Sequence, residues 1–216
     1  MLSLLNIKPD HDDYGDRLQI TEAPIMQMKD EELKRMTQDC DAVVSCLGHQ
    51  GTSSGIWGKE DRGLVTSTVR RLTSVMPSSA KFIVMGSELV SAPGDDQRGF
   101  LERLLLSLLR LLIPPHVDNE QASDYMFSLP RDGTSLEWCI VRPTSLREGP
   151  PRKYAVYSKP PGSLFGGYSV SRATVATFMV DLLTDAAKWD SHKYQAPVVH
   201  EDPPVSVAGA DTAKSV

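Results

Sequence analysis

The chain has 216 residues, 40% hydrophobic and 24% charged, a composition that is ordinary for a globular protein with a sizeable core. The net charge of −5 argues against general binding to nucleic acids or anionic membranes, so we expect neither as a partner. Three scattered cysteines without CxxC spacing predict reduced thiols in the cytoplasm, with no metal site and no disulfide framework.

The N-terminal part predicts two weak strands before the first helix. Met1–Leu5 is a short apolar run, and Leu18–Thr21 is a second candidate, which Pro24 ends. Asp30 can cap a helix that runs to about Gln38.

Three apolar, partly β-branched runs follow, and each ends in a small or turn-forming segment. The strands that we predict in them are Val43–Leu47, Lys81–Met85 and Trp138–Arg142. Helical patterns separate them, which indicates an α/β fold with these strands adjacent, parallel and buried on both faces. Ligands bind beyond the carboxyl ends of such strands. The residues that we expect there are Leu47, Gly48, Gly86, Ser87, Pro143, Thr144 and Ser145.

Two helices are expected between these strands. The first extends from about Arg62 to Met76, and the second covers the leucine-rich segment Phe100–Ile113. The leucine-rich segment contains three charged residues and is shorter than the roughly 20 residues of a membrane span. We interpret it as a core helix, with a lid or an oligomer interface as alternatives. Pro114-Pro115 ends it, and Asp118 can cap the next helix.

The C-terminal part predicts an edge strand at Tyr154–Tyr157, a helix capped by Ser171 and a last strand at Ala196–His200. Residues 1–200 are therefore expected to form a single domain. Residues 201–216 are small, polar and proline-containing, which predicts a disordered tail.

Two motifs have alternative interpretations. GHQGTSSG at Gly48–Gly55 is either a phosphate-cradling loop or a flexible loop. Its spacing differs from the dinucleotide fingerprint, and the next helix starts only near Arg62, which favours the flexible loop. Ser87 directly follows a buried strand, so its hydroxyl either contacts a ligand or ends the strand as a cap. No Tyr-x-x-x-Lys pair and no G-x-S-x-G elbow occur.

The order of these segments resembles a known family. DAVVSCLG, KFIVMGSE, the leucine helix leading into PPHVDNEQASDYM, LEWCIVRPTSLREGP and SVSRATVATFMVDLL are similar to the atypical short-chain dehydrogenase/reductases. More narrowly, they resemble the NAD(P)H-binding, NmrA-like group, which includes flavin reductase and biliverdin reductase B-like proteins. The most specific pieces are Trp-x-x-x-Arg-Pro at Trp138–Pro143 and Ser-Arg-x-x-Val-Ala at Ser171–Ala176.

The resemblance implies a Rossmann-like, doubly wound parallel sheet that binds NADP or NAD. The cofactor-binding residues that it implies are Leu47, Gly48, Gly86, Ser87, Pro143, Thr144 and Ser145. Among them, Ser87 takes the place of the family's active-site serine and is the candidate catalytic residue. The implied activity is hydride transfer from NAD(P)H to a small conjugated acceptor, such as a flavin or a quinone. The alternative is a non-catalytic nucleotide sensor or scaffold, and the oligomeric state stays open.

The chain also departs from this family. The family begins with a strand and G-x-x-G-x-x-G, and Met1–Leu5 instead resembles its second strand. Asn6 takes the place of the arginine that is usual at the end of that strand, which leaves Lys8 as the nearby cation for a 2′-phosphate. Pro24 falls where the family usually has an aspartate after its third strand. We therefore expect an N-terminally incomplete sheet, explained by an incomplete gene model or by direct pairing of the second and fourth strands of the family.

Overall fold

The main sheet has five strands in the order β1-β2-β3-β7-β5. The computed structural model describes residues 18–48, 63–112, 114–162 and 167–206. The strands are β1 (Ala42–Ser45), β2 (Lys81–Met85), β3 (Glu137–Pro143), β7 (Val198–Glu201) and β5 (Tyr154–Tyr157). The first four are parallel, and β5 pairs antiparallel with β7. The predicted α/β class and the adjacency of the three predicted strands, now β1, β2 and β3, are confirmed.

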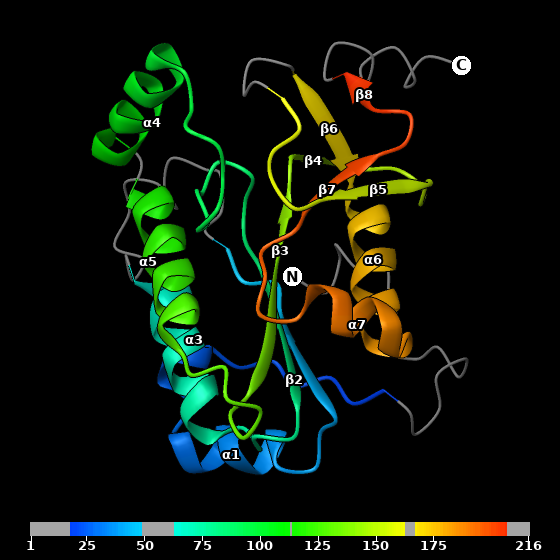
Figure 1. Cartoon of the computed structure of the whole chain (residues 1–216). Helices are drawn as coiled ribbons and strands as arrows, with labels where there is room; N and C mark the ends of the chain where they lie inside the picture. Colours follow the sequence, from blue (N-terminus) through cyan, green and yellow to red (C-terminus); the bar gives the residue numbers. More distant parts are fainter. Residues whose placement is uncertain (1–17, 49–62, 113, 163–166, 207–216) are drawn as a thin grey trace.

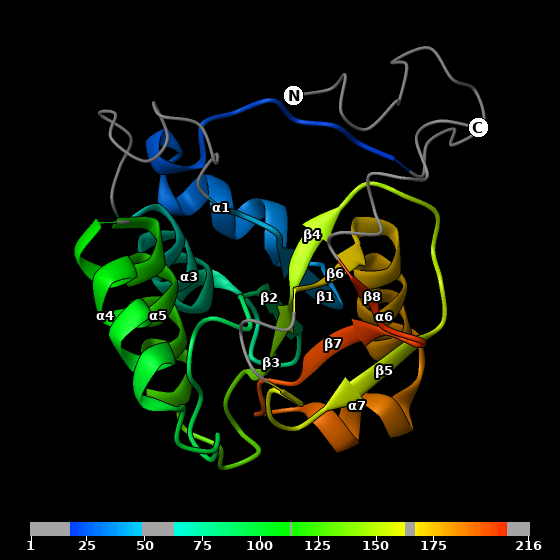
Figure 2. The same cartoon turned by 90° about the horizontal axis from the view of Figure 1, so that it is seen from above.

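Helices cover both faces of this sheet (Figures 1 and 2). On one side lie α1 (Asp30–Thr37), α3 (Leu64–Val75), α4 (Phe100–Leu112) and α5 (Pro114–Ser128). On the other side lie α6 (Arg172–Thr184) and α7 (Ala186–His192). A short 3-10 helix, η3 (Ile25–Gln27), precedes α1. None of the helices in the described part of the chain is long and apolar enough to cross a membrane.

The central strands fill two separate cores. In β2, Phe82 and Val84 join the buried cluster of α3 and α5, whereas Ile83 joins that of α6. In β3, Trp138 joins the cluster of α3 and α5, and Cys139 joins the cluster of α6. Successive side chains of a strand point to opposite faces, so a strand covered on both sides needs a continuous apolar run. This explains why the inner strands are recognisable in the sequence.

The expected strand at Leu18–Thr21 is wrong. The segment has no regular structure, and its side chains are exposed. Burial of its apolar residues therefore contributes too little to stabilise a strand here. Among the described residues, β1 pairs only with β2 and is an edge of the sheet. The other predicted N-terminal strand, Met1–Leu5, lies outside the described residues.

The interpretation of the leucine-rich segment as a core helix is also wrong. Phe100, Leu101, Leu104 and Leu108 of α4 are all at least half exposed. Figure 1 shows α4 at the outside of the helical layer, near the end of α5 and away from the sheet. α3 and α5 already cover that face of the sheet, so the apolar stripe of α4 has no core to enter.

The helix expected to begin at Asp118 begins at Pro114 instead. Proline is tolerated in the first turn of a helix, where backbone N–H groups have no partner within the helix. Pro114-Pro115 therefore separates α4 from α5 by starting the second helix. Asp118 does not cap α5, because its carboxylate accepts from the backbone N–H groups of Val65 and Thr66 in α3.

A second, three-stranded sheet lies beyond the end of β3 (Figure 1). Its strands are β4 (Ser145–Arg147), β6 (Tyr168–Ser171) and β8 (Val205–Ser206), in the order β4-β6-β8. Ser171 caps α6 as predicted, with its hydroxyl accepting from Thr174 N. The start of the expected tail needs correction, because Glu201 ends β7 and Val205–Ser206 pairs with β6.

Candidate functional site

A crevice of about 320 Å³ opens where β2 and β3 end. It is lined by Gly86, Ser87, Glu88, Leu89, Pro143, Thr144, Ser145, Leu146, Gly167 and Tyr168. Five of the seven residues predicted from the sequence therefore meet at one place. The volume lies at the lower end of the roughly 300–1,000 Å³ that is usual for ligand pockets.

Backbone pairing continues past the ends of β2 and β3 and shapes the floor of this crevice. Gly86 N donates to Val141 O at 2.8 Å, and Glu88 N donates to Pro143 O at 3.0 Å. A Cβ at Gly86 would lie 2.9 Å from the Ile140 side chain. Glycine is therefore required here by close packing against β3, which lets the two segments approach at the base of the crevice.

The hydroxyl of Ser87 has a role in the local turn. Leu89 N donates to Ser87 Oγ at 3.2 Å, and Val90 N donates to the Ser87 carbonyl at 3.0 Å. The interpretation of Ser87 as a residue that caps the end of the strand is therefore confirmed. A hydroxyl also has a proton to donate, and the half-buried Ser87 lines the crevice, so a ligand contact is compatible with the turn.

The other two predicted residues lie elsewhere. Leu47 lines a separate groove of about 410 Å³ beside β1, together with residues of the segment 21–28. Gly48 is exposed, with open space where a side chain would begin. The rest of the glycine-rich loop, residues 49–55, lies outside the described residues, so its proposed cradle has no described geometry.

Arg142 holds the loop that forms one wall of the crevice. Its side chain is 1% exposed and donates to both carboxylate oxygens of Asp95, at 2.6 and 3.0 Å. It also donates to the carbonyls of Val90 and Ala196. Burial raises the pKa of Asp95, but the hydrogen bonds from Arg142 and Ala92 N outweigh it, so this pKa is below its ordinary value.

A buried polar pair lies behind the crevice. His200 is 2% exposed, and its Nε2 lies 3.1 Å from Oε2 of Glu88, which itself lines the crevice. The His200 ring contacts the rings of Tyr157 and Tyr168, with centroids 5.7 and 5.6 Å away. Sequence reasoning missed this pair, whose only signal was the position of Glu88 next to Ser87.

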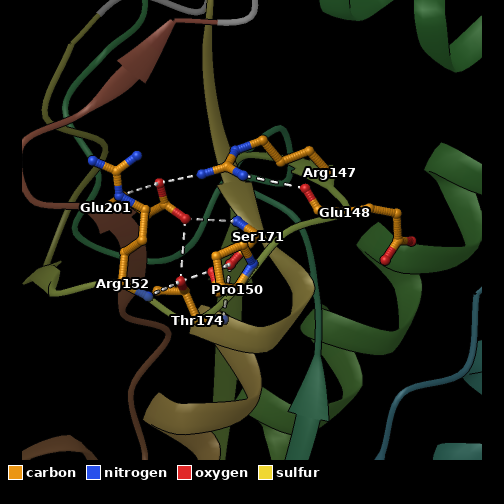
Figure 3. A network of polar contacts seen from close by, with 7 residues as sticks. All are labelled: Arg147, Glu148, Pro150, Arg152, Ser171, Thr174 and Glu201. Carbon is orange, nitrogen blue, oxygen red and sulfur yellow. Dashed lines mark hydrogen bonds and ion pairs between the residues drawn. The ribbon is translucent and has the colours of Figure 1, made fainter. Parts of the chain in front are cut away.

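A second buried carboxylate, Glu201, joins the small sheet to α6 (Figure 3). Glu201 accepts from Ser171 N at 3.0 Å and Thr174 Oγ1 at 3.1 Å, and it pairs with Arg147 of β4. Burial raises the pKa of Glu201, but the donors Ser171 N, Arg147 and Thr174 together place it below its usual range. Since β4 begins at Ser145, this network holds the opposite wall of the crevice.

At the N-termini of α3 and α6, some of the first backbone N–H groups are bound by the protein's own side chains. Asp118 accepts from Val65 N at 2.8 Å and from Thr66 N at 3.0 Å, which closes α3. Ser171 Oγ accepts from Thr174 N at the start of α6. These three N–H groups are therefore already bound within the protein and are not available to a pyrophosphate.

The parallel sheet, the helices on both faces and a crevice at the strand ends define a Rossmann-type nucleotide-binding fold. The family model described as "NAD(P)H-binding" matches residues 9–186. The chain therefore belongs to the NAD(P)H-binding family, in agreement with the expected cofactor, NADP or NAD. A search of curated protein sequences gives no significant match.

Solved structures from three bacteria, among others, share this fold. A Lactobacillus casei protein has a TM-score of 0.63 and 16% identity, over 88% of this chain and 82% of that one. A wide-type short-chain dehydrogenase/reductase from Veillonella parvula, solved with NADP, has a TM-score of 0.57 and 19% identity, over 90% of this chain and 77% of that one. A Rossmann-fold NAD(P)-binding family protein from Shigella flexneri has a TM-score of 0.51 and 20% identity, over 85% of this chain and 70% of that one.

Proposed function

We propose that the chain is an NAD(P)H-dependent oxidoreductase of the atypical short-chain, NmrA-like type. Its acceptor is a small conjugated ring, flavin- or quinone-like, bound in the crevice beyond β2 and β3. The observation that carries the proposal is the convergence of Gly86, Ser87 and the segment Pro143–Ser145 on one pocket in a member of the NAD(P)H-binding family. Membership of that family supports nucleotide-dependent redox chemistry in general.

Each residue has a distinct role in this proposal. A bound nicotinamide supplies the hydride, and the protein orients it. The Ser87 hydroxyl donates to the carboxamide or to the acceptor, while Pro143–Ser145 forms the facing wall. Leu47 and Gly48 follow β1 at the same edge of the sheet and extend the proposed cofactor path. A conjugated acceptor takes its proton from water, so no side-chain acid is needed.

Replacing Ser87 tests the proposal. Ser87→Ala removes the hydroxyl with little change in size, and positioning errors of about 1 Å can cost on the order of 100-fold in rate. We expect a lower kcat for NADPH oxidation by a soluble quinone, with at most a small decrease in melting temperature from the lost bond to Leu89 N. Ser91→Ala is the matched control, because Ser91 is exposed in the same loop and outside the crevice lining. Equal rates for both variants would show that Ser87 has no catalytic role.

The second candidate is a nucleotide sensor or scaffold of the NmrA-like kind. The side-chain acceptors at the N-termini of α3 and α6 favour it, because they take three backbone N–H groups that could otherwise bind a pyrophosphate. Titration of the purified chain with NADPH and NADH, followed by nicotinamide fluorescence, separates the two. Binding with turnover supports the enzyme, binding without turnover supports the sensor, and no binding at millimolar cofactor supports the scaffold.

A further inference from the structure

One wall of the crevice is aromatic. Tyr168, the first residue of β6, lines the crevice and is 37% exposed, so one part of its side chain meets solvent and another is covered. Its carbonyl accepts from Thr144 Oγ1 at 3.0 Å, which ties this wall to the wall formed by Pro143–Ser145. Tyr168 is the one aromatic side chain in the described lining of the crevice.

The ring of Tyr168 rests on a buried, hydrogen-bonded support. The His200 ring packs against it, with a centroid distance of 5.6 Å and an interplanar angle of 50°. The Tyr157 ring also packs against His200, with a centroid distance of 5.7 Å and an interplanar angle of 72°. Because Glu88 bonds His200 Nε2 and is itself fixed by Pro143 O and by Arg98, His200 has little freedom to turn. The support therefore connects Tyr168 to the residue that follows Ser87.

The charge of the crevice restricts what can bind next to Tyr168. Its described lining contains no lysine or arginine, and Glu88 is its one carboxylate. A phosphate or carboxylate on the acceptor would find no cation here, whereas an uncharged ring would meet Tyr168, Leu89 and Leu146. Aromatic rings pack favourably on each other in offset or tilted arrangements beyond their burial alone.

We propose that Tyr168 is the stacking and specificity residue for an uncharged, planar, quinone-like acceptor, and that the Glu88–His200 pair is its positioning support. This inference rests on the proposed function, because it assigns the acceptor half of the same crevice. Tyr168 touches the acceptor directly. His200 lies outside the described lining and acts through Tyr168, so its removal should matter only while the Tyr168 ring is present. Glu88 lines the crevice as well as bonding His200, so the support is tested at His200.

The probe is duroquinone, a benzoquinone with a methyl group on each free ring carbon. These methyl groups block addition of the exposed Cys46 thiol to the ring. Calorimetry of the purified chain gives its Kd, and NADPH oxidation gives KM and kcat. We expect Tyr168→Leu to raise the duroquinone Kd and KM roughly two- to tenfold, with NADPH affinity unchanged. Tyr168→Phe keeps the ring and should stay within about twofold.

A double-mutant cycle tests the support. His200→Gln removes the ring next to Tyr168 and keeps a hydrogen-bonding group for Glu88. It should weaken duroquinone binding, and His200→Gln combined with Tyr168→Leu should be no weaker than Tyr168→Leu alone. Glu88→Gln keeps the hydrogen bond to His200 and should not weaken binding. If His200→Gln fails to fold, His200→Asn replaces it. Independent, additive effects would overturn the positioning role.

The outcomes separate this inference from the proposed function. Equal duroquinone affinity in Tyr168→Leu and the unaltered chain overturns the stacking role, even if NADPH binds and is oxidised. NADPH binding without any duroquinone binding also overturns it and leaves the cofactor proposal intact. Absence of NADPH binding refutes the proposed function, while the calorimetric comparison of the Tyr168 variants still decides the stacking role.

Discussion

At the scale of single residues, Arg142 bonds several distant groups that the Trp-x-x-x-Arg-Pro motif did not predict. The guanidinium is buried and bonds Asp95 in a bidentate manner, as well as two backbone carbonyls from different loops. A planar group with several fixed donors suits this arrangement, which lysine could not reproduce. Arg142 therefore binds the loop from Ser87 to Gly99 at Val90 and Asp95, and with it one wall of the crevice.

Removing that guanidinium should be costly. Arg142→Met leaves the Asp95 carboxylate buried without its partner, so we expect the free energy of unfolding to fall by about 3–5 kcal/mol. Urea denaturation measures the change. Arg172→Met is the control, because Arg172 pairs with Glu148 at the surface and should contribute no more than about 1 kcal/mol. Equal losses in the two variants would contradict the role given to burial.

His116 makes stability depend on pH. The side chain is 7% exposed, and Nε2 has no hydrogen-bond partner among the described residues, with Glu120 Oε1 3.5 Å away. Burial lowers the pKa of His116, and although Glu120 opposes this, Arg110 and Arg98 lower it further. The unfolded chain, with a pKa of about 6.5, then binds more protons than the folded chain. Stability is therefore lost as the pH falls below about 6.5.

His116→Gln should reduce this loss, because glutamine does not titrate. We expect the free energy of unfolding to fall less between about pH 7 and pH 5 in the variant than in the unaltered chain. Urea denaturation at both pH values makes the comparison. Parallel decreases in the two proteins would assign the acid sensitivity to other groups.

At the scale of elements, α3 is capped from a neighbouring helix. The Asp118 carboxylate of α5 reaches the first N–H groups of α3, and Thr66 Oγ1 donates back to the Asp118 carbonyl at 2.9 Å. The negative carboxylate also lies at the positive end of the α3 dipole. One residue therefore both closes a helix and joins two helices that cover the same face of the sheet.

We expect Asp118→Ala to lower the free energy of unfolding by about 1–2 kcal/mol, the usual cost of losing a cap. Asp118→Asn keeps one acceptor oxygen and should lose less. Thermal denaturation of both variants under the same buffer conditions measures the difference. A larger loss for asparagine than for alanine would contradict the capping role.

At the scale of the whole molecule, α3 and α4 both carry leucines on the same side of the sheet but differ in how far these are buried. Leu72 of α3 is 5% exposed and belongs to the core, whereas Leu104 of α4 is 59% exposed. Both helices are amphipathic, so the difference comes from their layer: α3 lies on the sheet, and α4 lies outside it near the end of α5 (Figure 1).

The matched substitution Leu→Ala should expose this difference. Leu72→Ala creates a cavity and should cost about 2–5 kcal/mol, whereas Leu104→Ala should change the free energy of unfolding by no more than about 0.5 kcal/mol. Urea denaturation of the two variants tests both values. Similar costs would mean that the apolar face of α4 is covered in solution.

Local patterns in the sequence determined the inner sheet and most of the crevice. β2 and β3 are buried on both faces, so they had to be continuous apolar runs, and the small residues after them had to mark the strand ends. Parallel strands bring their carboxyl ends to one edge, which is why Ser87 and Thr144 could be placed together. The edge β1 and the exposed segment Leu18–Thr21 carry less of this signal.

The tertiary structure alone decided the long-range partners. Glu88 and His200 are 112 positions apart, and Asp118 is 53 positions from Val65, so no local spacing relates them. The leucine spacing in α4 shows which face of the helix is apolar. Only the packing of α3 and α5 against the sheet determines that this face stays out of the core. Local sequence determines which elements form, because propensity and periodicity act over a few residues. Which side chains meet depends on how the elements pack, and that is a property of the whole chain.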